Sequence, residues 1–260
     1  MTVSGESGLS GRVAVVTGGH DGVGYYIAEA LLDEGMRVAL LARRNEVLQR
    51  AAGKLAGDVL PVVCDIRDPD SVRAAFARVD EGLGNVSVLV NNAATISIYR
   101  IADASDEELH ATVETNLLGV MYCIREAAAR MRTAGLGDIV NITSEAVLRP
   151  FPYLLGYSAT KAAVETLSRG LKRELAPLGI RVGVLRSGRV AVPDRQPGTR
   201  WDPERAEAFF KEAYAGGFIE HEGDGIDPRT TAQSIVHMLC LPRDSSIDVL
   251  ELRDGGEIRE

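Results

Sequence analysis

Hydrophobic positions along the chain follow two alternating patterns. Short runs rich in valine and isoleucine predict buried strands, and longer stretches with apolar residues at helical spacing predict amphipathic helices. The expected strands are Arg12–Thr17, Arg37–Ala42, Leu60–Asp65, Val86–Asn91, Asp138–Thr143, Arg181–Arg186 and Ile247–Leu252. The expected helices are Gly24–Glu34, Pro69–Glu81, Asp106–Thr133, Tyr157–Ala176, Pro203–Ala215 and Pro228–Leu241. This alternation is typical of a parallel sheet covered by helices.

We therefore expect an α/β fold: a single doubly wound, Rossmann-type domain with a seven-stranded parallel sheet and helices on both faces. A length of 260 residues suits one such domain. Residues 1–10 are expected to be a flexible N-terminal segment, and 11–260 the domain. The long insert between the last two strands, about 190–227, contains proline, glycine and one short helix. Such an insert is typical of a substrate lid.

Charge and cysteine content narrow the classes of function. The net charge is -8 and the isoelectric point is near 5.2, so nucleic acid and anionic membrane surfaces are poor partners. The three cysteines are far apart and odd in number, which predicts neither a disulfide framework nor a metal site. Met1–Gly11 has no apolar core, and no apolar run reaches the length of a membrane span. We expect a cytoplasmic protein that acts on a small molecule.

A glycine-rich turn follows the first expected strand. It reads Thr17-Gly18-Gly19-His20-Asp21-Gly22-Val23-Gly24 and leads into an amphipathic helix. Glycines there permit a tight turn and let backbone N–H groups approach a pyrophosphate, which the positive end of the helix also stabilises. The strand before it and the helix after it favour a dinucleotide site over a turn without a ligand.

The end of the second strand bears on the choice of cofactor. A carboxylate there would bind the ribose 2′-OH of NAD(H), but the residues are Ala42-Arg43-Arg44. Arg43 offers a guanidinium to a 2′-phosphate, so NADP(H) is favoured, with NAD(H) possible. The negative charge of Asp21 in the glycine turn would repel a nearby phosphate and so argues against NADP(H). Arg43 and Arg44 are also compatible with solvated arginines at the start of a helix. His20 is a second candidate for the phosphate, although a lone loop histidine is equally compatible with solvent exposure.

Tyr157 and Lys161 are the candidate acid/base pair. Their spacing of four residues places the phenol and the ammonium on one face of a helix. The neighbouring lysine cation and an oxidised nicotinamide ring would both favour the phenolate and lower the pKa of the tyrosine, which would make Tyr157 a general acid/base near neutral pH. The spacing Tyr-x-x-x-Lys is also compatible with two exposed residues on the surface of a helix. The choice between the two interpretations depends on the other polar residues expected near this pair.

Three polar positions accompany this pair. Ser144 follows the fifth strand, where its hydroxyl would face the ligand crevice and bond a substrate carbonyl. Asn116 interrupts an apolar helix and needs a partner such as a backbone carbonyl or an ordered water. The fourth strand ends in Asn91-Asn92-Ala93-Ala94, where small residues allow close approach to a cofactor and the amides can brace neighbouring strands.

In this combination the chain resembles the short-chain dehydrogenase/reductase family, over nearly its whole length from Gly11 to about Gly256. The glycine turn, the Asn91–Ala94 strand end and the order Asn116, Ser144, Tyr157, Lys161 carry the resemblance, with the family's usual interval between serine and tyrosine.

The resemblance implies roles for particular residues. Lys161 would also hold the nicotinamide ribose, and Asn116 would hold a water on a proton path from Lys161 to solvent. Asp65 would lie against the adenine ring, and Asn92 would border the cofactor. The cofactor set it implies is Gly18, His20, Gly22, Val23, Gly24, Arg43, Asp65, Asn92, Ala93, Tyr157, Lys161, Gly188 and Val190.

Two departures from the family pattern affect the nicotinamide end. The family's Pro-Gly after the sixth strand is Ser187-Gly188, and the threonine expected nearby is Val192, which removes a hydroxyl worth about 1 kcal/mol as a hydrogen bond. The backbone N–H of Val190 remains available to the carboxamide. Ala94 replaces the family's glycine, a small change where the backbone φ is negative.

The expected reaction is direct hydride transfer between the nicotinamide and a secondary alcohol or ketone, with no metal. A cofactor-binding scaffold or redox-sensing regulator without turnover is the alternative, and an epimerase or dehydratase fits less well because those relatives are longer. The family also implies a homo-oligomer, a tetramer or a dimer, paired through the helices Asp106–Thr133 and Tyr157–Ala176. The substrate is left open. Trp201, Phe209, Phe210, Tyr214 and Phe218 would either line its pocket or pack the lid helix onto the body.

Overall fold

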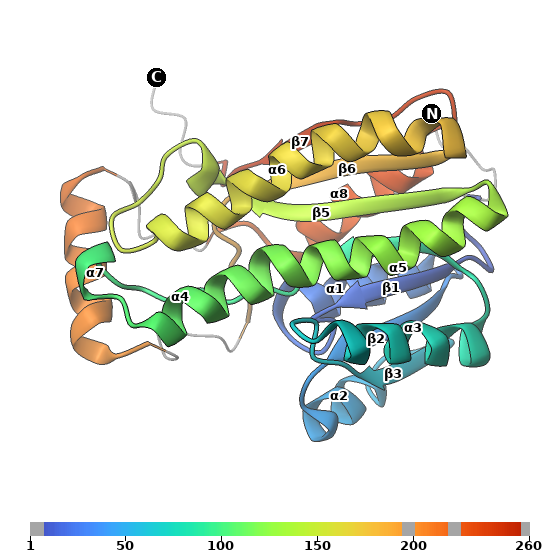
Figure 1. Cartoon of the computed structure of the whole chain (residues 1–260), viewed down its shortest axis with the longest axis horizontal. Helices are drawn as coiled ribbons and strands as arrows, with labels where there is room; N and C mark the ends of the chain where they lie inside the picture. The colour runs from blue at the N-terminus through green and yellow to red at the C-terminus, as the bar shows by residue number, and fades with distance from the viewer. Residues whose placement is uncertain (1–7, 194–200, 218–224, 256–260) are drawn as a thin grey trace.

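Seven parallel strands form one sheet in the order β3-β2-β1-β4-β5-β6-β7 (Figure 1). The computed structural model describes residues 8–193, 201–217 and 225–255. The strands are β1 Val13–Thr17, β2 Arg37–Ala42, β3 Val59–Val63, β4 Val86–Asn91, β5 Gly137–Ser144, β6 Ile180–Ser187 and β7 Val249–Leu252. The expected fold class is confirmed. Part of the expected N-terminal segment and of the expected lid lies outside the described residues.

Helices cover both faces of the sheet. They are α1 Gly22–Asp33, α2 Asn45–Ala52, α3 Pro69–Leu83, α4 Asp106–Val113, α5 Gly119–Ala134, α6 Leu155–Leu175, α7 Pro203–Ala215 and α8 Pro228–Cys240. Short 3₁₀ turns span Ile101–Asp103, Glu145–Val147 and Ala176–Leu178, and a π-helical turn spans Glu114–Leu118. None of the described helices is long and apolar enough to cross a membrane.

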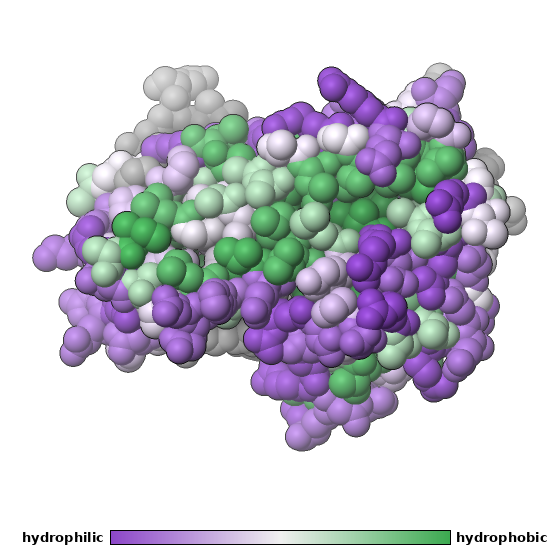
Figure 2. Space-filling model, in the orientation of Figure 1, coloured by the Kyte–Doolittle hydropathy of each residue, from purple (hydrophilic) through white to green (hydrophobic). Residues whose placement is uncertain are grey.

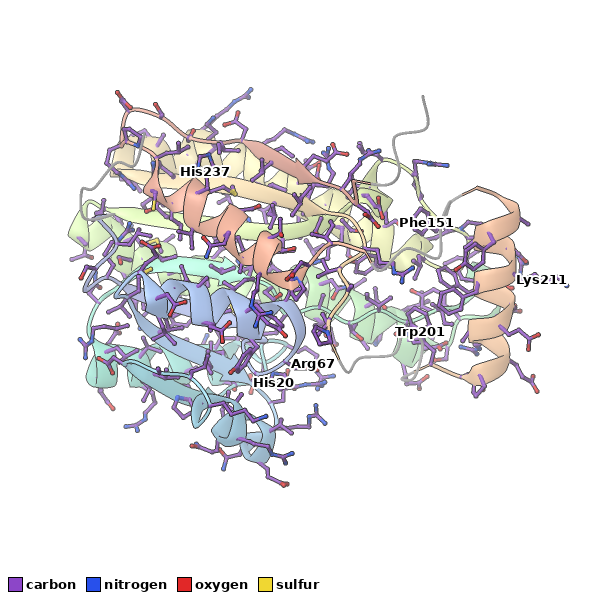
Figure 3. All side chains as sticks on the ribbon, turned by 180° about the vertical axis from the view of Figure 1, so that it is seen from behind. His20, Arg67, Phe151, Trp201, Lys211 and His237 are labelled. Atoms are coloured by element: carbon purple, nitrogen blue, oxygen red, sulfur yellow. The ribbon has the colours of Figure 1, made fainter. Side chains whose placement is uncertain are left out.

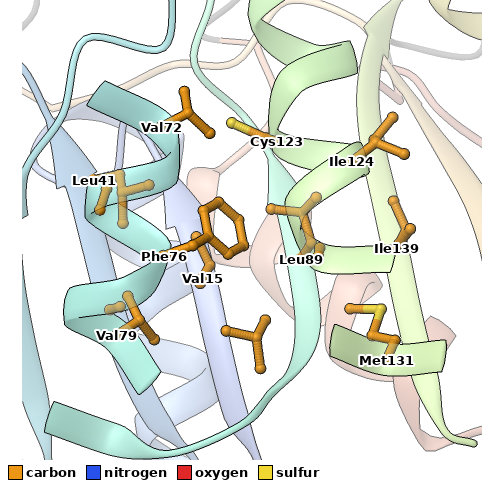
Figure 4. Close-up of a cluster of buried hydrophobic side chains, with 14 of the residues drawn as sticks. Val15, Leu41, Val72, Phe76, Val79, Leu89, Cys123, Ile124, Met131 and Ile139 are labelled. Atoms are coloured by element: carbon orange, nitrogen blue, oxygen red, sulfur yellow. The ribbon is translucent and has the colours of Figure 1, made fainter. Parts of the chain in front are cut away.

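The two sides of the sheet build two hydrophobic cores. Along β1, Val13 and Val15 face α3, α5 and α6, whereas Ala14 and Val16 face α1 and α8, as the twofold period of a strand requires. Figure 4 shows the first core, in which Phe76 of α3 lies among side chains from the sheet and α5. Because both faces are buried, the strands read as continuous apolar runs.

Helix starts follow their local chemistry. The Asp21 side chain accepts a hydrogen bond from Gly22 N–H and caps α1. Asp68 caps α3 ahead of its first-turn proline, and the capping box between Ser105 and Glu108 is present at the start of α4.

Many element ends differ from the expected ones by one or two residues, and three differences bear on the argument below. Helix α2 was not expected. The expected helix Asp106–Thr133 is divided into α4 and α5 by the π-helical turn. The third strand ends at Val63, so Asp65 lies beyond it.

The strand order places the candidate site. Strand β1 pairs with both β2 and β4, so the chain winds in opposite directions from this point, and a ligand crevice is expected at the carboxyl ends of these two strands. Helix α7 lies beyond the arrowhead of β5 (Figure 1). The glycine turn after β1 and helix α7 beyond β5 therefore both lie on the carboxyl side of the sheet.

Candidate active site

The glycine turn is built for close approach. Gly18 and Gly22 adopt positive φ angles of 67° and 58°, which side chains rarely tolerate. A Cβ added at Gly24 would lie 2.4 Å from Nδ2 of Asn92 and 2.5 Å from the carbonyl oxygen of Gly18. The glycines thus let the first turn of α1 lie close to the ends of β1 and β4, and the N-terminus of a helix placed there fits a pyrophosphate.

Thr17 joins the glycine turn to the end of β4. Its hydroxyl accepts hydrogen bonds from the backbone N–H groups of Asn92 and Ala93, both at 3.0 Å. Asn92 in turn donates from Nδ2 to the carbonyl oxygen of Thr17 at 2.9 Å. One strand further, Asn91 donates to Oδ1 of Asn141 at 2.8 Å. The asparagine amides therefore brace neighbouring strands, and the bracing role of Thr17 was missed in the sequence.

Two arginines lie around one carboxylate at the end where the adenosine is expected. Asp65 accepts from Arg67, with Nε to Oδ1 at 3.0 Å and Nη2 to Oδ2 at 2.6 Å. These bonds, with a smaller contribution from the charge of Arg43, hold the pKa of Asp65 below its usual value. Arg43 is exposed at the end of β2 beside the buried Ala42. Asp65, expected against the adenine ring, is engaged by Arg67, and sequence reasoning did not single out Arg67.

The two ends of the site are set apart along the carboxyl edge. Figure 3 shows His20 and Arg67 in one part of the molecule, and Trp201 and Phe151 near α7 in another. Val23 is the second residue of α1, between Gly22 and Gly24, and is half-buried.

Tyr157 and Lys161 lie on one face of α6, as their spacing predicts. Nζ of Lys161 lies 5.7 Å from the centre of the Tyr157 ring and donates to the carbonyl oxygen of Ile142 at 2.8 Å. The Tyr157 hydroxyl is hydrogen-bonded to the Ser144 side chain. The structure thus brings three of the four expected catalytic side chains together at the end of β5.

Burial governs the acid/base properties of this pair. Burial raises the pKa of Tyr157 to about 12; the bond with Ser144 lowers it, and the charge of Glu145 raises it further. Burial also lowers the pKa of Lys161 to about 8. Desolvation of the phenol thus outweighs the Lys161 cation, whose Nζ is directed to a backbone carbonyl. The predicted lowering of the tyrosine pKa also counts the positive charge of an oxidised nicotinamide ring, so it stays a prediction.

Asn116 lies in the π-helical turn and is fully buried. Its Oδ1 accepts from Thr95 N–H at 2.8 Å, and its Nδ2 donates to the Thr95 carbonyl at 2.9 Å. Nδ2 also reaches Oγ1 of Thr160 at 3.4 Å, and Thr160 donates to the carbonyl of Tyr157 at 2.7 Å. Of the two partners expected for this amide, the backbone is the one observed. The side chain therefore ties the loop after β4 to the start of α6.

Helix α6 makes further polar contacts with β5 along the same face. Glu165 is 3% exposed and accepts from the Thr143 hydroxyl at 2.8 Å. It also accepts two hydrogen bonds from Arg186 of β6, from Nε to Oε1 at 2.9 Å and from Nη2 to Oε2 at 2.7 Å. One turn on, Ser168 accepts from Nδ2 of Asn141 at 2.9 Å. The hydrogen bonds from Arg186 and Thr143 outweigh burial and lower the pKa of Glu165. Sequence reasoning missed both Glu165 and Arg186.

The segment after β6 is held by backbone bonds. Gly188 N–H donates to the carbonyl of Leu252 at 2.8 Å. Val190 forms a parallel bridge with Ile226, made by Ala191 N–H and the Arg189 carbonyl. This bridge does not use the Val190 N–H, which was expected to face the carboxamide.

Helix α7 is attached to the body by polar contacts at both ends. Trp201 Nε1 donates to the carbonyl of Ile96 at 2.8 Å, and Arg205 pairs with Glu108 at 2.6 Å. Near the other end, Glu212 pairs with Arg100. These contacts hold the inner face of α7 toward the Tyr157 end of α6.

The aromatic residues in and beside α7 differ in how deeply they are buried. Phe209 is buried and packs edge-on against Tyr153 and Trp201, with ring centres 6.3 and 5.6 Å away. Trp201 and Phe210 are half-buried, and Tyr214 is exposed. Phe218 lies outside the described residues. Phe209 therefore serves packing, and Tyr157 contacts the same cluster.

Tyr153 has the only positive φ among the described non-glycine residues, at 68°. Its ring lies under the guanidinium of Arg100 at 4.7 Å, and its hydroxyl donates to Glu212 at 3.4 Å. Contacts with the body and α7 thus hold a backbone conformation that is unfavourable for a side chain.

Comparisons with known proteins agree with this geometry. The family model described as short chain dehydrogenase matches residues 12–202. An uncharacterized oxidoreductase of Staphylococcus aureus is 27% identical over 246 residues, which cover 94% of this chain and 98% of the relative. The alcohol dehydrogenase of the archaeon Thermococcus sibiricus, complexed with 5-hydroxy-NADP, has a TM-score of 0.77 at 30% identity, covering 96% of this chain and 99% of that one. The 3-ketoacyl-(acyl-carrier-protein) reductase of Brucella melitensis, complexed with NADH, has a TM-score of 0.81 at 27% identity, covering 96% and 100%.

The chain therefore belongs to the short-chain dehydrogenase/reductase family. It is an NAD(P)-dependent oxidoreductase that acts on the alcohol or ketone group of a small molecule.

Proposed function

We propose that this protein interconverts a secondary alcohol and a ketone with NADP(H), and that Tyr157 is the general acid/base. The observation that carries the proposal is the meeting of Tyr157, Lys161 and Ser144 at the end of β5, on the same carboxyl edge of the sheet as the glycine turn. When bound, the nicotinamide would supply or accept the hydride, and its oxidised ring would add a positive charge near the phenol.

The side chains would divide the remaining work. In the direction of reduction, the Tyr157 hydroxyl donates its proton to the substrate oxygen as the carbonyl becomes an alkoxide. The Ser144 hydroxyl, already bonded to that phenol, orients the same oxygen and polarises the carbonyl. The Lys161 ammonium stabilises the phenolate that is left. Asn116 fixes the π-helical turn, whose backbone we propose as the holder of a water on the path to solvent.

The direct test is consumption of NADPH, followed by its absorbance, with a panel of ketones. Turnover supports the oxidoreductase. Tight NADPH binding with no turnover across the panel would support the alternative, a cofactor-binding scaffold or redox-sensing regulator.

We propose a preference for NADP(H) because of Arg43. It is exposed at the end of β2, no carboxylate stands at Ala42, and Arg67 adds a second guanidinium nearby. Asp21, which opposed this reading, caps α1 by accepting from Gly22 N–H at 2.7 Å. The two structural relatives described above were complexed with an NADP derivative and with NADH, so the preference rests on this chain's residues.

Arg43→Ala is expected to lower kcat/KM for NADPH by roughly tenfold to a hundredfold, because a charge-assisted bond to phosphate is worth about 1.5–3 kcal/mol. The value for NADH should change little. Arg44→Ala is the matched control, since it removes the neighbouring exposed charge. Ala42→Asp should reverse the preference by placing a carboxylate beside the ribose. Equal losses for both cofactors in Arg43→Ala would contradict the assignment.

We propose that copies of the chain associate through α4, α5 and α6, as a tetramer or a dimer. Figure 2 shows hydrophobic residues gathered on the face formed by α5 and α6. Val113, Met121 and Leu155 are large apolar side chains exposed on α4, α5 and α6, and such patches mark interfaces. Light scattering should give a mass of at least twice the 27.9 kDa of one chain. A single-chain mass at every micromolar concentration would refute association.

We propose a reducing, cytoplasmic setting. Cys64 and Cys123 are buried free thiols, and burial raises the pKa of Cys64 to about 11, which keeps it protonated and unreactive.

A further inference from the structure

A glycine occupies the helix position directly before Tyr157. Gly156 is the second residue of α6, and its backbone does not adopt a positive φ. A side chain would therefore be tolerated by the backbone here, and alanine is more favourable than glycine within a helix. The glycine at this position is explained by the space around its Cα and not by its conformation.

The ring of Tyr99 fills the space that a side chain on Gly156 would need. A Cβ added at Gly156 would overlap the Tyr99 hydroxyl oxygen and would lie 3.1 Å from Cζ and 3.6 Å from Cε2 of the ring. Non-bonded heavy atoms pack best at about 3.5–4.0 Å, so this overlap is not allowed without a displacement. The tip of the phenol thus lies directly against the first turn of α6.

Tyr99 has little freedom to move away from this contact. It is only 3% exposed, and a tyrosine side chain is rigid apart from two torsion angles. Its backbone N–H donates to the carbonyl of Tyr153 at 3.0 Å, two residues before α6 begins. Its hydroxyl makes no hydrogen bond with any of the residues that the structure describes. Packing against Gly156 is therefore the contact that this buried hydroxyl makes.

The segment that carries Tyr99 is anchored on both sides. Before it, Thr95 exchanges two hydrogen bonds with Asn116, at 2.8 and 2.9 Å. After it, Arg100 pairs with Glu212 of α7. Because both ends of the segment are held, the ring forms a fixed surface against which the start of α6 packs.

The position of this first turn bears on the reaction. Gly156 is covalently joined to Tyr157, and one turn further on Lys161 is held by the carbonyl of Ile142 in β5 at 2.8 Å. Nζ of Lys161 lies 5.7 Å from the centre of the Tyr157 ring. A displacement of the first turn alone would move the phenol relative to this ammonium and to the end of β5. Small errors in placing a reacting group are costly to rate.

We propose that Tyr99 is a positioning residue, whose ring packs against Gly156 and fixes the first turn of α6 so that the Tyr157 phenol is held in its reactive position. The proposal rests on the function proposed above. It explains the glycine, because only a residue without a Cβ lets the turn lie against the ring. It also gives the loop after β4 a part in placing the acid/base group.

Gly156→Ala is expected to lower kcat by roughly tenfold to a hundredfold, because the added methyl group displaces the first turn. The Kd for NADPH, measured by the fluorescence of the bound cofactor, should stay within about twofold of the parent value, since the glycine turn is not displaced. A purely structural role would change the amount of folded protein without separating kcat from this Kd.

Gly170→Ala is the matched control. It makes the same substitution in the same helix at an exposed position. There the added Cβ would have none of the described residues within 4 Å beyond its own helical neighbours. Its kcat should equal that of the parent.

The double variant Tyr99→Phe/Gly156→Ala isolates the contact. The phenylalanine lacks the overlapping oxygen and leaves Cζ at 3.1 Å from the added Cβ, which a small shift of the ring relieves. The kcat of the double variant should therefore exceed that of Gly156→Ala by roughly fivefold or more. Tyr99→Phe alone should lose no more than about threefold, because its ring still packs against the helix.

Tyr99→Leu removes the contact from the other side. The shorter side chain keeps the site apolar but no longer has a ring tip to reach Gly156. We expect kcat to fall roughly threefold to tenfold while the Kd for NADPH is unchanged. Adding Gly156→Ala to this variant should cause no further loss, because the methyl group enters the space that the ring has left.

Thermal unfolding keeps the test decisive if Gly156→Ala folds poorly. Its Tm should fall by roughly 3–10 °C, because overpacking a buried contact is destabilising, whereas the Tm of Gly170→Ala should stay the same or rise. The double variant with Tyr99→Phe should regain most of this loss. A double variant as unstable as Gly156→Ala would show that the methyl group does not meet the Tyr99 hydroxyl, and would overturn the proposal.

Two kinetic results would also overturn it: a kcat of Gly156→Ala equal to the parent value, or a double variant no faster than Gly156→Ala. Failure of the proposed function would look different. If the parent protein turns over none of the alcohols or ketones, the function is wrong and the positioning role fails with it, while the Tm values still measure the contact. Turnover by the parent, with every variant equal to it, would reject Tyr99 alone.

Discussion

Tyr157→Phe is expected to lower kcat by about 10²–10⁴-fold while the Kd for NADPH stays near the parent value. The substitution removes only the oxygen that would exchange the proton, and the ring that packs against the aromatic cluster below α7 is kept. Steady-state rates and fluorescence titration measure the two quantities separately.

Tyr153→Phe is the matched control for this variant. It removes a phenol four residues earlier, whose hydroxyl donates to Glu212 of α7 and not to the Ser144 side chain. The control should retain most of the rate. If kcat of Tyr157→Phe stays within tenfold of the parent value, Tyr157 is not the general acid/base, whatever the rate of Tyr153→Phe.

Asp138→Ala is expected to reduce the free energy of unfolding by about 3–5 kcal/mol, because it leaves Arg12 and Arg181, whose side chains are only 13% exposed, without their carboxylate. Asp138 is 3% exposed and pairs with Arg12 and Arg181 at 2.6 Å and with Arg243 at 2.9 Å. Chemical denaturation measures the loss. These residues lie at the amino ends of the strands, opposite Ser144, so kcat of the folded variant should change little.

Arg243→Gln provides the comparison for Asp138→Ala. Its side chain is 40% exposed, and its removal leaves the carboxylate with two arginine partners. A loss of about 1 kcal/mol or less is expected. If both variants lose the same stability, the three arginines do not depend on Asp138.

The fold was largely predictable because its signals are local. Buried strands appear as apolar runs, and the four-residue spacing of Tyr157 and Lys161 fixes their common face regardless of the rest of the chain. Helix α2 was not predicted because it spans only eight residues, and its two buried residues, Leu48 and Ala51, are too few to show a helical period. The π-helical turn was not predicted because the apolar periodicity continues through it. The polar Asn116 was the only sign in the sequence that the helix is interrupted there.

Features that depend on distant partners could not be predicted. Glu165 and Arg186 are 21 residues apart, and their pairing follows from the packing of α6 on β6. The direction of the Lys161 ammonium depends on the carbonyl of Ile142, and the extent to which burial raises the pKa of Tyr157 depends on the packing around it. Residue types alone state which charges are present but not how far each is removed from water.

The polar contacts between α6 and β5 determine how accurately the phenol is placed. Four side chains of α6, namely Tyr157, Lys161, Glu165 and Ser168, are hydrogen-bonded to consecutive residues of one strand. A displacement of the helix by one residue, about 1.5 Å along its axis, would break all of these bonds at once.

The helix therefore has a single allowed setting against the strand, and that setting is defined over roughly 16 Å of its length. Small errors in placing a reacting group are costly to rate. The tolerance of the reaction to mutation is consequently set partly by Ser168 and Asn141, far from any atom that exchanges a proton or hydride.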